Sequence, residues 1–341
     1  MAVEAAVIQR VPTAAARMAA AASQFLGSLD EFRQKIAHFP FQGDERFVWN
    51  YRPDGLEWNG SILWHEGLRL INMTDVQKRA ALALMDTGLS TTGAVQARDI
   101  MELERHLRET ERHGRFVSHA VRDVEIYSFA VFGEPGGRAP WGWRVGGHHI
   151  GLQFTIVDGE CVASTPLFFG ANPAEVRHGS GVGLRTLPQE EDLARALLKS
   201  LGAEQKGIAL ISPTAPADII TDAYRAWDTT LGSRGLTYGA LNGEHRTRLV
   251  ELIRVYIDRA SEDLAAATWS KIERAGLEPI TFAWSGGEEK GQGHYYSIKG
   301  PTFLIEYDCT QDGANHIHST MRDTTSDWGQ DALAAHYRES H

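Results

Sequence analysis

Cysteine is scarce in this sequence: Cys161 and Cys309 are the only two in 341 residues. A pair of cysteines in a chain of this length does not build the disulfide framework on which small secreted proteins depend. We expect both to be reduced thiols, since free cysteine usually packs as a small hydrophobe. Because Cys309 directly follows Asp308, a ligand role for its sulfur stays open.

Long apolar runs are absent as well. No stretch reaches the roughly 18 apolar residues of a membrane-spanning helix. The alanine-rich segment 1–22 is interrupted by Glu4, Arg10 and Arg17, and it lacks the continuous apolar run of a signal peptide. These absences predict a cytoplasmic protein without a membrane partner.

Basic residues are fewer than acidic ones. The chain has 34 Lys and Arg residues against 44 Asp and Glu residues, which gives a formal net charge of -10. Nucleic acids are poor partners for such a chain, since phosphate binding needs a basic surface. We expect a small-molecule substrate instead, and a homo-oligomer stays open.

Several catalytic motifs are missing. The segment 178–183 contains Gly-x-Gly, but no strand leads into it and no acidic residue follows in the usual place, so it is not a dinucleotide fingerprint. Gly179-Ser180-Gly181 lacks the spacing of the Gly-x-Ser-x-Gly elbow, and no His-Glu-x-x-His sequence occurs. None of these three kinds of site is predicted.

Helical and strand patterns occupy different parts of the chain. Phe25, Leu29 and Phe32 share one face of a helical pattern. Alternating apolar residues and short turns mark two groups of strands, 125–169 and 279–322. The predicted helices cover 13–37, 75–86, 91–112, 189–201, 249–257, 262–273 and 327–337. The predicted strands cover 125–132, 141–157, 160–169, 279–284, 294–298, 302–309 and 316–322.

This order of elements predicts an α+β fold. Strands joined by short turns pair antiparallel, and the helices gather before and between the strand groups instead of alternating with single strands. We expect an antiparallel β-sheet core in which the two strand groups share one sheet or face each other. A single domain over 1–341 is predicted, with a mostly helical cover at 1–115 and the sheet and the site at 120–341.

Acidic and histidine side chains alternate with apolar ones in two neighbouring strands near the C-terminus. Glu306 and Asp308 share one face of the first strand, and His316 and His318 share one face of the second. If the two strands pair through a turn at 309–314, these four side chains converge. Imidazole and carboxylate donors together suit a divalent metal better than they suit a core.

A third strand adds another histidine. If the strand continues without interruption after Gly147, His149 shares a polar face with Gln153, whereas His148 lies on the apolar face. His149 is then the better ligand, but a bulge at Gly146-Gly147 would exchange the two, so both stay candidates. The alternative is a buried hydrogen-bond network without metal. The predicted metal ligands are therefore His148 or His149, Glu306, His316 and His318, for iron, copper, manganese or zinc.

Two arginines are candidates for holding a substrate. Arg144 lies among tryptophans, and Arg322 lies on the same face as His316 and His318. A planar guanidinium suits a carboxylate, so both are predicted to hold a small polar or carboxylate-bearing molecule. The alternative is an internal salt bridge to Glu306 or Asp308.

Three functions fit these residues. The first is a metal-dependent, oxygenase-like oxidoreductase with an aromatic cavity wall that includes Trp143, Tyr295, Tyr296 and Tyr307. The second is a zinc-type hydrolase in which Asp308 or Glu306 acts as general base. The third is a binding protein without catalytic activity.

The chain also carries several short motifs spread over nearly its whole length. They are Phe39-Pro40-Phe41, Gly67-Leu68-Arg69-Leu70, Trp141-Gly142-Trp143-Arg144, Gly147-His148-His149, Thr165-Pro166-Leu167-Phe168-Phe169-Gly170, Ile305-Glu306-Tyr307-Asp308, Asn315-His316-Ile317-His318-Ser319 and Arg322-Asp323. In this set the chain resembles an uncharacterised family known as domain of unknown function thirty-five hundred. The resemblance implies one domain and no known activity. Cys309 departs from the asparagine that the family has after its Tyr-Asp pair.

Overall fold

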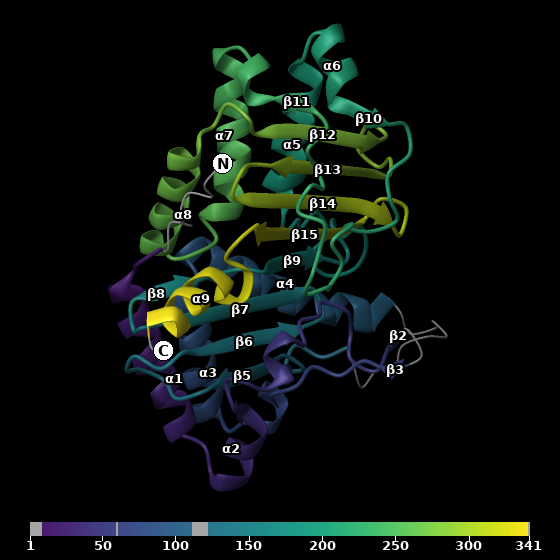
Figure 1. Ribbon diagram of the computed structural model, residues 1–341. Coiled ribbons are helices and arrows are strands. Elements are labelled where there is room, and N and C mark those ends of the chain that lie inside the picture. Colours follow the sequence, from purple (N-terminus) through teal and green to yellow (C-terminus); the bar gives the residue numbers. More distant parts are fainter. Residues whose placement is uncertain (1–8, 59–60, 111–121, 340–341) are drawn as a thin grey trace.

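A computed structural model describes residues 9–58, 61–110 and 122–339 (Figure 1). Its main feature is one large sheet with helices packed along it, so the α+β prediction is confirmed. The described strands are β1 (His38–Phe39), β2 (Glu57–Trp58), β3 (Ser61–Ile62), β4 (Leu68–Arg69), β5 (Ser128–Phe132), β6 (Trp141–Gly147), β7 (Ile150–Val157), β8 (Cys161–Ala163), β9 (Leu167–Ala171), β10 (Leu210–Ser212), β11 (Leu236–Thr237), β12 (Thr281–Gly286), β13 (His294–Lys299), β14 (Phe303–Gln311) and β15 (His316–Asp323).

The two predicted strand groups share this sheet. Its order is β1-β5-β6-β7-β9-β15-β14-β13-β12-β10, and most neighbouring strands are antiparallel. The groups meet where β9 pairs antiparallel with β15, with Gly170 opposite His318. The β6–β7 pair, whose connection carries His148 and His149, is therefore separated from the C-terminal hairpin by β9 alone, in the middle of the sheet (Figure 1).

The described helices mostly follow the predicted pattern. The predicted helix 13–37 is split in two because Asp30 caps a new helix by accepting a hydrogen bond from Arg33 N at 2.9 Å. Thr74 caps the third helix in a capping box with Gln77. One short helix between 203 and 209 was not predicted. The bounds are α1 (Pro12–Gly27), α2 (Glu31–Ala37), α3 (Asp75–Gly88), α4 (Thr91–Thr110), α5 (Pro188–Ser200), α6 (Ala203–Ala209), α7 (Gly243–Ile257), α8 (Glu262–Ala275) and α9 (Gln330–Glu339).

These helices do not include a membrane span. Among the residues that the structure describes, no helix combines the length and the apolar character needed to cross a bilayer. The predicted end of α4 at 111–112 lies outside the described residues.

One face of the sheet is apolar and packs against helices. Ile305, Tyr307, Ile317 and Met321 of the C-terminal hairpin belong to one buried cluster with residues of α1, α3, α4, α5, α7 and α8. The cluster confirms the predicted inward face of both strands, because alternate side chains of a strand point to opposite sides.

The other face of the sheet is polar but also buried. Glu306, Asp308, His318 and Arg322 all lie there with little or no exposed surface. Two segments cover this face: residues 41–53, and residues 213–235, which we call the strap. Aromatic and apolar side chains pack between them and the sheet in a small cluster that includes Trp49, Tyr51, Phe168, Ile219 and Trp328. Buried polar side chains need partners, and the strap supplies several of them.

Candidate metal centre

The C-terminal hairpin brings two histidines to the polar face. In the β14–β15 pair, Asp308 lies opposite His318 and Gln311 opposite His316, with an irregular register between Asp308 and Gln311. The side chain of Ile317 packs on the other face. His316 and His318 are therefore neighbours on one side of the sheet, as the alternation predicts.

The third histidine comes from a turn and not from a strand. β6 and β7 are joined at His148 and His149, and the backbone of His149 has a positive φ of 65°. Its main chain is fixed on both sides, because His149 N donates to Tyr51 O at 2.8 Å and Gly170 N donates to His149 O at 2.9 Å. The bulge considered at Gly146-Gly147 does not occur, because both glycines pair with β7; the chain turns at the next two residues instead.

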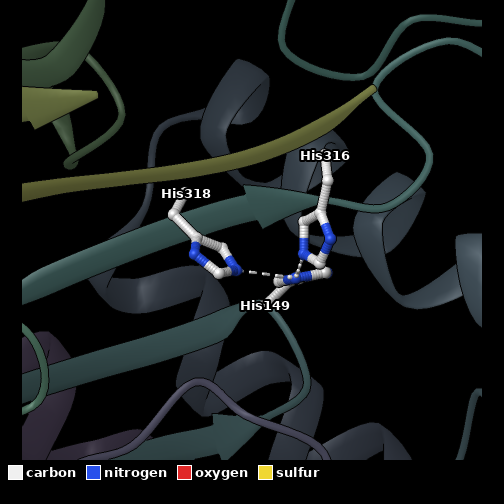
Figure 2. A group of neighbouring side chains, drawn as sticks. All are labelled: His149, His316 and His318. Carbon is white, nitrogen blue, oxygen red and sulfur yellow. Dashed lines mark hydrogen bonds between the residues drawn. The ribbon is translucent and has the colours of Figure 1, made fainter. Parts of the chain in front are cut away.

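The three imidazoles converge on one point (Figure 2). His149 Nε2 lies 2.8 Å from His316 Nε2 and 3.2 Å from His318 Nε2, and all three side chains are buried. Nitrogen ligands at about 2.0–2.1 Å from a zinc ion stand about 2.9–3.4 Å from one another. The two short distances lie close to or inside this range, and the ligand nitrogens of all three rings lie within 4.8 Å of one another, so the group could hold one ion.

Carboxylates orient two of the three rings. His316 Nδ1 lies 2.8 Å from Asp312 Oδ2, and His318 Nδ1 lies 2.7 Å from Asp218 Oδ1. Each carboxylate accepts the Nδ1 proton, which leaves the Nε2 lone pair of that ring directed at the common point. Lone pairs directed at one another repel unless a proton or a cation lies between them, so this donor set fits a metal ion.

The protonation of these rings suits the same role. Burial, followed by the charges of His148, His316 and His318, holds the pKa of His149 well below its ordinary value. Burial also lowers the pKa of His318, although its hydrogen bond with Asp218 acts in the opposite direction. Neutral imidazole is the form that binds metal.

Glu306, a predicted ligand, is engaged elsewhere. It is fully buried and accepts hydrogen bonds from Ile220 N at 2.6 Å, from Thr221 N at 3.2 Å and from Tyr295 Oη at 2.9 Å, besides one from the Thr221 hydroxyl. Its oxygens hold the strap against the sheet. The structure therefore does not bring Glu306 into the group of three histidines.

Asp308 lies close to the centre but outside it. It is fully buried, accepts hydrogen bonds from Thr310, and lies with Asp218 and His318 in a second group whose ligand atoms are all within 4.8 Å of one another. Burial first, and then the charge of Asp218, raises the pKa of Asp308 to about 8. Asp308 is thus a buried carboxyl group beside His318.

His148 is not part of the three-histidine group, although it lines the same pocket. Its Nδ1 contacts Glu104, with which it forms a short hydrogen bond, and lies 2.8 Å from Arg122 Nη1. Its ring stacks on His149 with 3.8 Å between centroids. Burial raises the pKa of Glu104 to about 7. Glu104 belongs to the charged half of α4 but is buried, because His148 and Arg122 pack against it.

The two predicted substrate arginines hold the scaffold. Arg144 donates to Glu45 O at 2.6 Å and to Glu66 O at 3.1 Å. Arg322 Nε donates to Asp327 Oδ2 at 2.6 Å, and Arg322 Nη2 donates to a backbone carbonyl oxygen of the strap. Neither lines the pocket at the histidines. Their guanidinium groups satisfy loop carbonyls and one carboxylate instead of a substrate.

The predicted aromatic wall is also placed differently. Trp143, Tyr296 and Tyr307 pack in the core on the helical face of the sheet, and the hydroxyl of Tyr295 donates to Glu306. Tyr51 takes the place of these residues at the site, with its ring edge-on to His318 at 5.0 Å between centroids.

A pocket of about 340 Å³ opens onto the three histidines. Its lining includes residues that the sequence did not single out: Tyr51, Arg52, Arg122, Asn172, Asp218 and Asp312. Asp312 lies four residues before His316 in the hairpin turn, so its spacing offered a signal. Asp218 belongs to the strap, about a hundred residues from the histidine that it orients, and nothing local in the sequence marked it.

Comparisons with known proteins give a family but no activity. A search of curated proteins and a search of solved structures each found no match. A family model described as "Protein of unknown function (DUF3500)" matches residues 12–330, which include every histidine and carboxylate of the centre. The chain therefore belongs to the DUF3500 family.

Proposed function

We propose that this protein is a metal-dependent enzyme that acts on a small polar molecule, with His149, His316 and His318 as the ligands of a divalent ion. One observation carries the proposal: three buried Nε2 atoms lie at ligand spacing around one point, and two of the rings are oriented by carboxylates. The pocket beside them provides access for a substrate.

Water-activating, hydrolase-type chemistry is the function that this ligand set supports best. Three neutral imidazoles leave the charge of a divalent ion undiminished, and such an ion, when bound, makes water more acidic and polarises a carbonyl or phosphoryl oxygen. The predicted oxidoreductase rested on a carboxylate ligand. Glu306, the residue expected in that role, binds the strap instead.

The chain's own residues supply orientation and proton transfer. Asp218 and Asp312 keep the Nδ1 protons of His318 and His316 in place. Asp308, beside Asp218, has a pKa of about 8, raised by burial. A group that titrates near neutral pH can take up and return a proton during turnover. Asp308 does not line the pocket, so a proton held there would pass through Asp218 or His318, beside which it lies. In this proposal Asp308, the predicted general base, is a proton store behind the centre.

An oxidoreductase is the second candidate. Imidazole ligands alone also suit copper and iron, whose preference for nitrogen donors is strong. The edge-on contact between Tyr51 and His318 places a phenol next to a ligand. The identity of the bound metal separates the two candidates, since zinc has no redox chemistry.

Elemental analysis of protein purified without an affinity tag tests the proposal. About one equivalent of metal is expected in the native protein, and little in His316→Ala and His318→Ala. His178→Ala, in an exposed loop, is the matched control and should retain the metal. A chain that binds no metal, either as purified or after titration with zinc, iron and copper salts, would be a metal-free binding protein.

The metal then decides the chemistry. Zinc, together with cleavage of test esters, phosphoesters or amides that is lost in His318→Ala, supports the hydrolase. Iron or copper, together with oxygen consumption by the loaded protein, supports the oxidoreductase.

A further inference from the structure

The pocket at the three histidines is small and has two arginines in its lining. Its volume of about 340 Å³ lies at the lower end of the range for ligand pockets, about 300–1,000 Å³. Arg52 comes from the segment that covers the polar face, and Arg122 lies just before β5. A pocket of this size suits a small ligand.

The two arginines flank the centre on different sides. Arg52 Nη2 lies 3.6 Å from Asp218 Oδ2, and Asp218 orients His318. Arg122 Nη1 lies 2.8 Å from Nδ1 of His148, whose ring stacks on His149.

Both guanidinium groups are held in position by the fold. Their side chains are only 9% and 6% exposed. Arg52 Nη1 donates to Asp222 Oδ1 at 2.7 Å, and Arg122 Nη1 lies 3.6 Å from Glu104 Oε2. A guanidinium carries five N–H donors in a rigid fork. An arginine fixed in advance binds a ligand at a smaller cost in side-chain entropy.

The acidic groups near the pocket already have fixed partners. Asp222 and Glu104 pair with the arginines from outside the pocket lining. Asp218 and Asp312 line the pocket, but each is bound to the Nδ1 of a histidine, and Asp218 also pairs with Arg52. The charged N–H donors in the lining therefore belong to Arg52 and Arg122.

We infer that the pocket selects a small carboxylate, and that Arg52 and Arg122 are the residues that determine this specificity. The inference rests on the proposed function, because it places the carboxylate beside a metal held by the three histidines. It replaces the predicted anchors Arg144 and Arg322, which bind loop carbonyls and Asp327.

Protein loaded with cobalt provides the test, since the visible spectrum of Co²⁺ changes when a ligand binds near it. Acetate should change the spectrum of the native protein, whereas acetamide, its neutral isostere, should not. Arg52→Gln and Arg122→Gln should each raise the dissociation constant for acetate by about tenfold or more while cobalt stays bound at the native stoichiometry. Arg52→Lys keeps the charge but not the fork and should fall between.

The control is Arg105→Gln on the exposed face of α4, which should bind acetate as the native protein does. Circular dichroism checks that each variant is folded. Equal binding of acetate and acetamide, or unchanged acetate binding in both glutamine variants, would overturn the inference and leave the metal centre intact. If the native protein binds no cobalt, the proposed function fails. The role of the arginines is then tested on the metal-free protein, through the stabilisation that acetate gives against unfolding. Stabilisation that is present in Arg105→Gln and lost in Arg52→Gln would support the carboxylate specificity, and no stabilisation of the native protein would overturn it.

Discussion

Gly170 lies directly against the imidazole of His149. A Cβ atom at position 170 would come within 2.7 Å of His149 Cδ2 and within 2.7 Å of the carbonyl oxygen of Ile317. Because Gly170 N also donates to His149 O, the backbone of β9 fixes both the main chain and the ring of this histidine. The absence of a side chain at position 170 is therefore what allows the turn between β6 and β7 to reach the hairpin histidines.

Gly170→Ala should damage the centre. The methyl group must push the ring of His149 or separate β9 from β15, and overpacking of this kind costs about 1–3 kcal/mol of unfolding free energy. We expect weaker zinc binding and a lower unfolding midpoint. Gly207→Ala in α6, where a Cβ atom has nothing within 4 Å, is the matched control. It should leave zinc binding unchanged and raise the unfolding midpoint slightly, because alanine favours a helix over glycine by up to about 1 kcal/mol. Native zinc affinity in Gly170→Ala would show that this contact does not position His149.

Asp218→Asn and Asp312→Asn should weaken metal binding without unfolding the protein. An amide no longer holds the Nδ1 proton as a carboxylate does, so the ring loses orientation and basicity. Loss of such a partner typically lowers metal affinity by about 10–100-fold. Competition with a chelator measures the affinity, and Asp75→Asn at the exposed start of α3 serves as control. Unchanged affinity in both variants would argue against the assigned tautomers.

Glu306→Gln tests the link between the strap and the centre. The amide NH₂ would face N–H donors that now point at a carboxylate oxygen, and an unsatisfied buried group costs about 1–3 kcal/mol. We expect lower stability and, because the strap carries Asp218, weaker zinc binding. Tyr295→Phe removes only one donor and should have the smaller effect. A stability loss without any change in zinc affinity would show that the strap does not control the centre.

His294 should make the stability of the metal-free protein depend on pH. Burial lowers its pKa to about 4, and its ring donates to Gln292 O while accepting from Arg195. The folded state therefore favours the neutral ring, whereas the unfolded chain takes up a proton near pH 6.5. The stabilisation is complete above about pH 6.5 and is lost as the pH falls towards about 4.

Denaturant unfolding of native protein and His294→Gln over this range measures the contribution. The variant should be less stable at neutral pH, and the difference should shrink as the pH falls. His178→Gln, in an exposed loop, should follow the native curve. A difference that stays constant with pH would mean that His294 is not kept neutral by the fold.

Much of the fold followed from short-range patterns. The helix predicted at 75–86 and the apolar face shared by Ile305, Ile317 and Met321 are both found, since helix periodicity and strand faces depend on neighbouring residues. The split of the first helix at Asp30 was missed because the apolar spacing continues through the cap. Position 149 illustrates the limit of the alternation argument: His149 reaches the site from a turn, where a two-residue period does not apply.

The sequence by itself determined the hairpin that carries His316 and His318, because alternation within two adjacent strands fixes which side chains share a face. Only the tertiary structure decided which carboxylates serve the histidines. Glu306 and Asp308 share the polar face of the hairpin, yet the strap takes up the hydrogen bonds of Glu306, while Asp218 reaches His318 from the strap. A buried carboxylate binds whatever donors the completed fold places around it, and such donors come from segments far away along the chain.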